Sequence, residues 1–305
     1  MSRLLVIVVT FNGMRWLERC LGSVQSSNVE ADLFVVDNNS SDGSADFVAE
    51  RFPQALLVRL ENNLGFARAN DIGLKYALDK DYDFVYLLNQ DAWVMPDTFE
   101  NLIGAFSDDV WGIISPLQLR PDLTTPDKRF RRHFHGSYEP SEIVAPVRFV
   151  MAAHWMISSK CLKKTGLFSP AFRHYGEDNN YCDRARYHGF GIGVLTSAKG
   201  AHDRQARKKS KPERINLNCQ YSKVRLSDPN SSFFIQAVWQ PVRQCLMALR
   251  WLSLLPFSNI PSLIKEYPIL RKWREESMSE GAFIHSAEQT LFKNNGCGHN
   301  LCQWS

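Results

Sequence analysis

The chain has no apolar run long enough to cross a membrane, although 44% of its 305 residues are hydrophobic. Its most apolar late segment, residues 233–257, is interrupted by Pro241, Arg243 and Arg250, which a spanning helix does not carry in its middle. The early run Leu4–Val9 is too short for a secretory signal peptide, and we expect none. The late segment instead predicts one or two amphipathic helices, which lie on the rest of the protein, on a membrane surface or on a second copy.

A disulfide framework is also missing from the sequence. The seven cysteines are odd in number and most lie far apart, so we expect reduced thiols, as in a cytosolic protein. Cys297 and Cys302, with His299 between them, have the residue types of a metal site. They lack a second pair to complete a tetrahedral set of ligands, and a loose tail is the alternative interpretation.

Positive charge is scarce in the first part of the chain, although the net charge is +4. Residues 1–122 contain 9 Lys and Arg against 18 Asp and Glu, whereas the remaining residues contain 27 against 14. The acidic first part argues against a nucleic-acid partner. The basic second part suits an anionic acceptor or an anionic membrane surface.

Apolar runs alternate with helical patterns through the first 90 residues. Runs rich in β-branched residues predict buried strands at Leu4–Val9, Leu33–Val36, Ala55–Leu60 and Phe84–Leu88. Helical spacing between them predicts helices at Met14–Gln25, Ala45–Phe52 and Gly65–Leu78. Strictly alternating strands and helices are typical of an α/β fold with a parallel sheet.

Polar side chains follow three of these strands, at the point where each strand ends. Asn12, Asp37 and Asp91 should therefore converge at one edge of the sheet, where ligands of open parallel sheets bind. The turn Thr10–Gly13 has neither the G-x-G-x-x-G of a dinucleotide dehydrogenase nor the Gly-rich basic loop of a sugar nucleotidyltransferase. Both of those enzyme classes are thereby disfavoured.

The second part of the chain has a less regular pattern, with an irregular excursion expected over residues 120–146. Further strands are expected at Trp111–Leu119, Phe149–Ile157 and Ile192–Leu195, and helices at Ser159–Thr165 and from Glu177 to about His188. Asp178 would lie in the first turn of the last helix, where the dipole favours an ionised carboxylate.

Five short motifs occur in order along residues 5–204. They are residues 8–12 (VVTFN), 35–44 (VVDNNSSDGS), 62–70 (NNLGFARAN), 87–91 (LLNQD) and 175–178 (YGED), the last followed by Arg184. Together they resemble the family-2 glycosyltransferases, in particular the rhamnosyltransferase and galactofuranosyltransferase branch. Each motif is weak alone, and the specificity comes from their order.

The resemblance implies a GT-A fold, in which a Rossmann-like, mainly parallel sheet is flanked by helices. We expect a catalytic domain at residues 1–225, with its nucleotide-binding part at 1–119 and its acceptor side at 120–225. The last hundred residues are not covered by the resemblance. For residues 226–305 we expect a helical, amphipathic extension.

The activity implied is inverting transfer of a sugar from a nucleotide-diphosphate donor, dTDP-rhamnose or a UDP-hexose. The acceptor would be a hydroxyl of a surface polysaccharide or a lipid-linked saccharide. The protein would be cytoplasmic, with peripheral contact to the inner face of the membrane or a homodimer as open alternatives. A nucleotide-sugar-binding module without catalysis is the rival interpretation, and a sugar nucleotidyltransferase is a weaker one.

The resemblance also implies the residues that hold the donor. The backbone near Thr10 and the side chain of Asp37 would hold the base and ribose, and Arg68 would reach the diphosphate. The complete implied set is Thr10, Asn12, Asp37, Asn63, Gly65, Arg68, Asn70, Asn89 and Asp91. For Asp37, capping of the following helix is the structural alternative.

A divalent metal, Mg²⁺ or Mn²⁺, is part of the implied site and would neutralise the departing pyrophosphate. Asp91 matches the last acid of the family's Asp-x-Asp motif, and His202 matches a histidine that completes the metal site in part of the family. The first acid of the motif is replaced by Asn89, which leaves strict metal dependence open. A purely structural His202 is the alternative.

Asp178 matches the family's catalytic base, which takes the proton from the attacking hydroxyl. Glu177 either positions the acceptor or supports Asp178. Two basic stretches, Lys128–His133 and Arg204–Arg214, are either solvated faces or contacts to donor pyrophosphate and acceptor phosphates. Aromatic residues could form a sugar platform, with core packing as the alternative: Trp93, Trp155, Phe172 and Tyr175.

Overall fold

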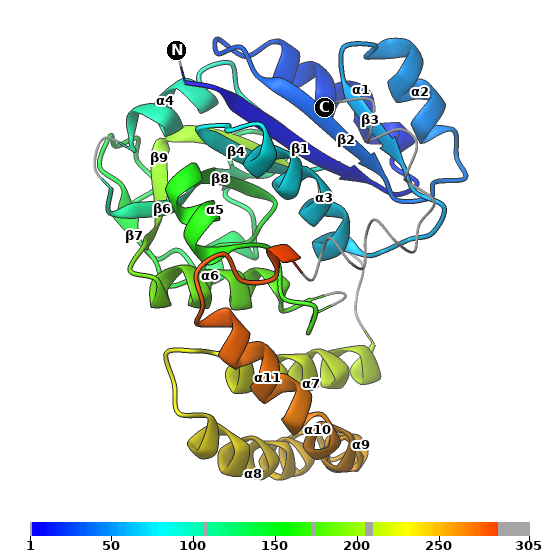
Figure 1. Ribbon diagram of the computed structural model, residues 1–305, viewed down its shortest axis with the longest axis vertical. Coiled ribbons are helices and arrows are strands. Elements are labelled where there is room, and N and C mark those ends of the chain that lie inside the picture. The colour runs from blue at the N-terminus through cyan, green and yellow to red at the C-terminus, as the bar shows by residue number, and fades with distance from the viewer. Residues whose placement is uncertain (1, 107–108, 173–174, 205–209, 286–305) are drawn as a thin grey trace.

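The computed structural model describes residues 2–106, 109–172, 175–204 and 210–285. A sheet flanked by helices forms one part of the molecule, and helices from the later chain form a separate layer beneath it (Figure 1). Cys297 and Cys302, considered above as a metal site or a loose tail, lie outside the described residues, as do residues 205–209 of the basic stretch.

The described strands form one nine-stranded sheet. Its order is β3-β2-β1-β4-β8-β6-β9-β5, and β7 pairs with β9. The strands are β1 (Leu4–Thr10), β2 (Asp32–Asp37), β3 (Leu56–Arg59), β4 (Phe84–Asn89), β5 (Ala92–Val94), β6 (Trp111–Leu119), β7 (Ala145–Pro146), β8 (His154–Ser158) and β9 (Gly191–His202). The first four are parallel, as predicted, but β8 lies antiparallel between β4 and β6, so the sheet is mixed.

Strand β1 lies in the middle of the parallel part and is buried on both faces. Its alternate side chains point to opposite sides of the sheet, so Leu5 and Ile7 join one apolar cluster and Val6 and Val8 the other. This two-sided burial explains the continuous apolar run in the sequence.

Helices cover both faces of the sheet (Figure 1). They are α1 (Met14–Gln25), α2 (Ser44–Arg51), α3 (Phe66–Asp79), α4 (Thr98–Gly104), α5 (Ser159–Thr165) and α6 (Glu177–Tyr187). The predicted helices agree with these bounds to within one residue at either end. The pair β5 and α4 was not predicted, because two such short elements carry no periodic pattern.

Two predicted strands differ from the structure. Over Phe149–Ala153 no ladder forms, because the carbonyls of Met151 and Ala153 accept from the Gln118 side chain at 3.2 Å and from the backbone of Asn89 at 3.1 Å. Strand β9 is much longer than predicted. Its glycines resemble turn residues in the sequence, but Gly193 is required by close packing inside the strand. A Cβ at Gly193 would lie 2.1 Å from the Val144 side chain.

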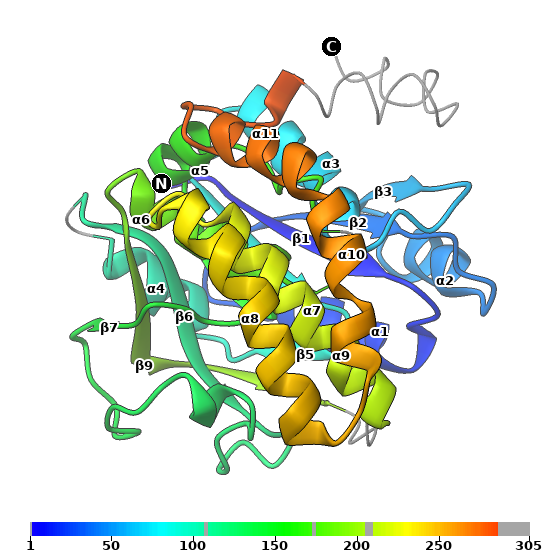
Figure 2. The same cartoon turned by 90° about the horizontal axis from the view of Figure 1, so that it is seen from below.

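The helical layer contains α7 (Lys211–Ser227), α8 (Phe233–Trp251), α9 (Leu255–Ser258), α10 (Ile260–Lys265) and α11 (Tyr267–Ser277). Seen from below, α7 and α8 run side by side beneath the sheet domain (Figure 2). The change from alternating to all-helical structure thus occurs at α7. Its start is fixed by a capping box, in which Ser210 and Glu213 bond each other's backbone N–H.

The predicted amphipathic helix in residues 233–257 is confirmed as α8, continued by the short α9. One of its faces exposes apolar side chains at helical spacing, among them Ile235, Val238, Val242 and Leu249. Within the described residues, no helix is both long and apolar enough to span a membrane. Whether a membrane or a second copy covers the apolar face stays a prediction.

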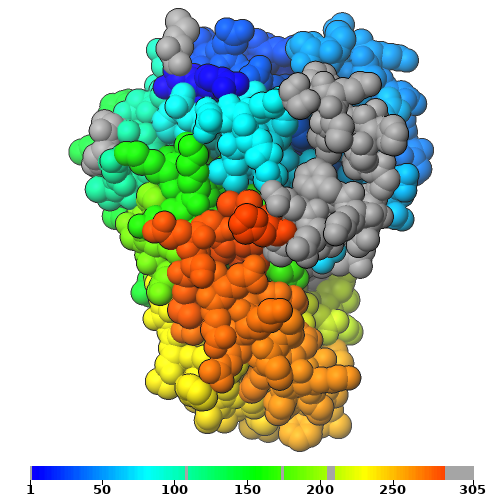
Figure 3. Space-filling model, in the orientation of Figure 1, coloured from blue at the N-terminus to red at the C-terminus, as the bar shows by residue number. Residues whose placement is uncertain are grey.

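The end of the helical layer returns to the sheet domain. Ala282 and Phe283 pack into the apolar core beside α5, and the amide of Leu167 donates to the carbonyl of Ala282 at 2.9 Å. At Gly166, φ is +79° and an added Cβ would lie 2.0 Å from the same carbonyl, so a larger residue does not fit there. The space-filling view shows the two parts of the chain in continuous contact along this face (Figure 3).

Arg184 anchors α6 to the rest of the domain. Its side chain is fully buried, and its guanidinium donates to the carbonyls of Leu167, at 2.6 Å, and Thr165. Burial lowers the pKa of this guanidinium to about 10, although nearby Tyr181 and Asp71 act to raise it. The arginine of the fifth motif is therefore a structural residue that positions the helix.

Replacing Arg184 with Met should lower the free energy of unfolding by about 2–4 kcal/mol, because two buried carbonyls lose their donor. Urea unfolding of both proteins measures this difference. Arg51→Met is the control, since Arg51 is 65% exposed and pairs with Glu18 at 3.4 Å on the surface. It should change the stability by less than about 1 kcal/mol. Equal effects of the two substitutions would refute the anchoring role.

Candidate active site

The carboxyl ends of β1, β2 and β4 lie side by side. Thr10 pairs with Asp37 on one flank of β1, and Val9 pairs with Asn89 on the other. The loops that follow these strands therefore meet at one edge of the sheet, as the sequence predicted. In folds of this type this edge is the ligand-binding edge.

Gln90 joins two of these loops. Its Oε1 accepts from the Thr10 hydroxyl and from the amide of Phe11, each at 2.8 Å. The Thr10 side chain is buried in this contact, so the adjacent backbone is the part that remains for a ligand. A Cβ at Gly13 would lie 2.3 Å from the same Oε1. Sequence reasoning missed Gln90, because its partner lies eighty residues away.

Asn12 and Asp37 lie in the first two loops. Asn12 has φ +49°, and it bonds the second loop through Ser40 Oγ at 3.0 Å and the Ser41 amide at 2.9 Å. Asp37 is buried, and its Oδ2 accepts from the Ser40 amide at 3.1 Å. Its Oδ1 is buried without a partner among the described residues, so it is available to a hydroxyl or imide donor of a ligand.

Asn63 and Gly65 form the next segment of the edge. Oδ1 of Asn63 accepts from the Gly65 amide at 2.9 Å and from the amide side chain of Asn38 at 3.1 Å. Asn38 also accepts from the Leu64 amide at 2.8 Å, which ties this segment to the end of β2. Gly65 has φ +83° and precedes α3 directly.

Arg68 and Asn70 lie on α3, in different surroundings. Arg68 is exposed in the first turn, where it can reach an anionic ligand. Asn70 is buried, and its side chain donates to the carbonyl of Phe66 at 2.9 Å within its own helix. The position of Asn70 gives no support to its predicted contact with the nucleotide.

Asp91 and His202 meet across the β5–β9 pair. Oδ1 of Asp91 lies 3.1 Å from Nε2 of the buried His202, whose Nδ1 is buried without a partner among the described residues. Burial acts to raise the pKa of Asp91, but the hydrogen bond and charge of His202 outweigh it and lower the pKa. Behind them, His154 bonds the Ala201 carbonyl and fixes the β9 backbone.

The donor set at this point suits a metal that is completed by its substrate. Among the described residues no group of three or more acidic, His or Cys side chains could hold a metal ion by itself. Mg²⁺ is usually held by one or two carboxylates together with substrate phosphates, and Asp91 supplies one carboxylate. The Nδ1 of His202, which has no hydrogen-bond partner among the described residues, suits a second protein ligand of the metal. Asn89, half-buried, precedes them on the same strand end.

Glu177 and Asp178 open α6, and two left-handed residues aim them at the site. Tyr175 has φ +68° and Gly176 has φ +98°. A Cβ at Gly176 would lie 2.8 Å from the Val224 side chain of α7, so glycine is required for both its conformation and its space. The turn therefore fixes the direction of the two carboxylates.

Both carboxyls at the start of α6 have raised pKa values. Burial raises the pKa of Asp178 to about 6, against the lowering effect of the Asn179 amide, which donates to its Oδ1 at 2.8 Å. Burial and the charge of Asp178 raise the pKa of Glu177 to about 8. Burial thus outweighs the helix dipole that the sequence analysis invoked. Near pH 7 Asp178 is an anion and Glu177 is protonated.

Arg204 lies between the two acidic parts of the site. Its Nε is 3.3 Å from Oδ2 of Asp127, and its charge also acts on Asp91 and Asp178. In the sequence this arginine is the first residue of the basic stretch Arg204–Arg214, and nothing there predicts a separate role for it. Arg204 follows the end of β9, where its charge acts on Asp91 and Asp178. This position distinguishes Arg204 from the other basic residues of the stretch.

A cavity of about 280 Å³ opens beside Asp178. Its walls come from the start of α6, from the segment before β8, from α7, and from the 3₁₀ turn η1 (Phe130–Arg132) with its flanking residues. The helical layer and the sheet domain therefore enclose it together. Its volume is close to the lower end of the usual range for small-molecule sites, about 300–1,000 Å³.

Two aromatic side chains of this cavity are accessible. Tyr175 is 39% exposed and Tyr221 of α7 is 45% exposed. Of the other candidates for a sugar platform, Trp155 and Phe172 are buried in the core. Trp93 is buried too, with the Arg19 guanidinium 3.5 Å from its ring centroid. Tyr175 alone keeps that predicted role.

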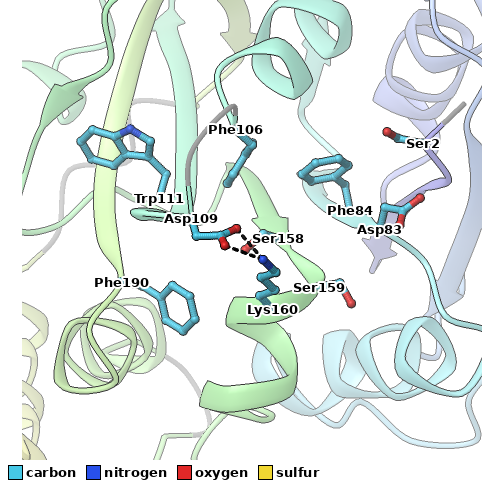
Figure 4. Close-up of a pocket in the computed structure, with 10 residues that line it drawn as sticks. All are labelled: Ser2, Asp83, Phe84, Phe106, Asp109, Trp111, Ser158, Ser159, Lys160 and Phe190. Atoms are coloured by element: carbon cyan, nitrogen blue, oxygen red, sulfur yellow. Dashed lines mark hydrogen bonds and ion pairs between the residues drawn. The ribbon is translucent and has the colours of Figure 1, made fainter.

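A second cavity of about 500 Å³ lies at the opposite edge of the sheet (Figure 4). Phe84, Trp111 and Phe190 face it, and Asp109 and Lys160 form an exposed ion pair at 2.6 Å. Although larger, it lies at the amino ends of β4 and β6, away from every candidate catalytic side chain. We therefore place the active site at the smaller cavity and the adjoining carboxyl edge.

Comparison with known proteins identifies the family and the fold of this chain. The family model for glycosyl transferase family 2 matches residues 5–166. An undecaprenyl-phosphate mannosyltransferase of Micrococcus luteus is 27% identical over 106 residues, which cover 34% of this chain and 44% of that protein. The match thus spans less than half of that relative's length. The rhamnosyltransferase and galactofuranosyltransferase branch finds no support in these matches.

Several solved glycosyltransferases share the fold over nearly the whole chain. S. aureus TarS 1–349, in complex with UDP-GlcNAc, gives a TM-score of 0.57 at 14% identity, covering 96% of this chain and 93% of that chain. The mannosyltransferase PcManGT from Pyrobaculum calidifontis, in complex with GDP-Man and Mn²⁺, gives 0.55 at 17% identity, covering 95% and 81%. At such identity the likeness establishes the fold, and the predicted GT-A architecture is confirmed.

The family model covers more than half of the chain, and the carboxylates identified above lie at the ligand-binding edge of a GT-A fold. The chain belongs to glycosyl transferase family 2 and is a glycosyltransferase.

Proposed function

We propose that this enzyme transfers a sugar with inversion, using Asp178 as the general base. The observation that carries the proposal is the half-buried carboxyl of Asp178 at the wall of the cavity, with a pKa of about 6. Such a group is ionised near pH 7 and still basic enough to accept a proton from a hydroxyl. Glu177, protonated at that pH, is proposed to position Asp178.

The donor is proposed to bind along the carboxyl edge of β1, β2 and β4. The free Oδ1 of Asp37 would accept from the base or ribose, and the segment of Asn63 and Gly65 would line the nucleotide. Arg68 would reach the diphosphate from the first turn of α3. A dTDP-sugar or a UDP-hexose remains our proposal for the donor, and neither is distinguished by these side chains.

Asp91 and His202 would hold a divalent metal, which neutralises negative charge on the leaving diphosphate when bound. Arg204, whose charge acts on Asp91 and Asp178, would stabilise the same developing charge from the protein side. Asn89 would contribute a carbonyl oxygen or contact the ribose.

The acceptor would enter the cavity between α6 and α7, so that its hydroxyl meets Asp178. The accessible rings of Tyr175 and Tyr221 would contact the apolar face of the acceptor sugar. A saccharide of a surface polysaccharide or of a lipid-linked precursor fits this site. The rival binding module without catalysis would have no need of a half-buried, ionisable Asp178.

Asp178→Asn should reduce transfer by about 10²–10⁴-fold, because the amide accepts no proton. Donor affinity should stay within about twofold, since Asp178 lies on the acceptor side. Rates with saturating donor and equilibrium binding of the donor nucleotide measure the two effects. Asp183→Asn, the same change five residues later on α6, is the control and should retain transfer. Normal turnover by Asp178→Asn would exclude Asp178 as the general base.

The pH dependence follows from the same carboxyl. Asp178 must be ionised to act, and its pKa is raised to about 6, so kcat/KM should fall about tenfold per pH unit below pH 6. A base with the ordinary aspartate pKa would lose activity only below about pH 4. A profile that stays flat from pH 7 to pH 5 would contradict the proposal.

Donor and metal binding are measured by thermal unfolding with UDP, dTDP or GDP, each with and without Mn²⁺. One nucleotide should raise Tm by roughly 5–10 °C at about 100 times its Kd, and more with the metal. Asp91→Ala should abolish the metal-dependent part of the shift. Asp97→Ala, an exposed aspartate on the same stretch of chain, should preserve it. A full metal response in Asp91→Ala would exclude Asp91 as a ligand.

A further inference from the structure

The turn η1 presents two arginines to the cavity beside Asp178. Arg129 and Arg132 are three residues apart, and in a turn of three residues side chains at this spacing lie on the same side. Both line the cavity, whereas Arg131, between them, is exposed and does not line it. The fully buried ring of Phe130 anchors the turn and fixes which side chains face the cavity.

Asp127 ties this turn to the catalytic residues. Its Oδ1 accepts from the backbone amides of Arg129 and Phe130, each at 2.9 Å. Its Oδ2 lies 3.3 Å from Arg204, whose charge reaches Asp178. The backbone of the turn that carries the two arginines is therefore tied to Asp127, which also contacts Arg204.

These arginines lack a carboxylate partner. Among the described residues neither Arg129 nor Arg132 forms an ion pair, and Asp127 is already engaged by Arg204. Arg129 also repels Arg204. The neighbouring His133 is neutral near pH 7, because burial and the charge of Arg132 lower its pKa. The rim of the cavity thus carries two arginines whose guanidinium groups form no ion pair with the described residues.

The donor diphosphate does not explain these charges. Asp91, the residue proposed to face the diphosphate with its metal, does not line the cavity. The opposite wall is α7, where the ring of Tyr221 is exposed toward the cavity and is held by the Arg243 guanidinium, 5.0 Å from its centroid. A cavity lined by an accessible aromatic ring and two arginines is suited to a sugar that carries an acidic group.

We propose that the acceptor is an acidic saccharide, whose carboxylate or phosphate is bound by Arg129 and Arg132 while its ring lies against Tyr221. This inference rests on the proposed function, since it assigns the acceptor class of the same site. A carboxylate would come from a uronic acid, and a phosphate from a sugar phosphate or a lipid-linked saccharide. Both are oxyanions that an arginine pair binds through charge-assisted hydrogen bonds.

The proposal is tested by the binding of three monosaccharide probes that share the glucose ring and differ only in the group at C6. They are methyl glucoside, methyl glucuronide and methyl glucoside 6-phosphate. Ligand-observed NMR titration of the full chain gives their affinities without turnover. At least one charged probe should bind roughly tenfold more tightly than the neutral one. The preferred anion, carboxylate or phosphate, distinguishes the two sources. In the double variant Arg129→Gln/Arg132→Gln the charged probes should bind like methyl glucoside.

Arg131→Gln is the matched control, since it removes an arginine of the same turn that faces away from the cavity. It should keep the preference for the charged probe. Equal binding of all three probes to the wild-type protein would overturn the proposal, and so would an equal loss in Arg131→Gln and the double variant. Because no transfer is measured, failure here leaves the Asp178 test unaffected. Failure of that test alone would leave an acidic-saccharide site without this base.

Discussion

The burial of two adjacent carboxyls at the start of α6 is the constraint on which the rest of the site depends. Burying Glu177 and Asp178 costs free energy, and their raised pKa values are the direct expression of that cost. The fold holds them there through the left-handed Gly176, the backbone bonds of Arg184 and the contact of α7 with the turn. A carboxyl in this environment is a stronger base than an exposed aspartate. Withdrawal from water is therefore the cause both of the free-energy cost and of the basicity that the proposed catalysis needs.

The helical layer completes the site rather than merely extending the chain. Helix α7 supplies one wall of the cavity proposed for the acceptor, and Ala282 packs into the core and joins the helical layer to the sheet domain. Arg204, at the end of β9, couples the two halves because its charge acts on Asp91 at the donor edge and on Asp178 at the acceptor cavity. The proposed donor and acceptor sites are therefore linked electrostatically, although their residues come from distant segments of sequence.

The sequence predicted what local patterns encode. The buried parallel strands, their crossover helices and the polar residues at the strand ends follow from periodicity and composition, and they agree with the structure within a residue or two. Features that depend on non-local contacts were missed. Strand β9 was predicted too short because its glycines resemble turn residues. In the structure Gly193 and Gly200 are required by the close approach of Val144 and His154. The roles of Gln90, Arg184 and Arg204 depend on partners 17 to 80 residues away, or on charges that only the folded chain brings near.

The central claim is a single in-line displacement in which Asp178 activates the attacking oxygen. The configuration of the product at its anomeric carbon tests this claim most directly. Water can replace the acceptor, so NMR of the sugar first released from the donor that binds, recorded before mutarotation, gives the answer without knowledge of the acceptor. The account predicts that the released sugar has the anomeric configuration opposite to that of the donor. Release with the donor's configuration would contradict single displacement and remove Asp178 from its proposed role.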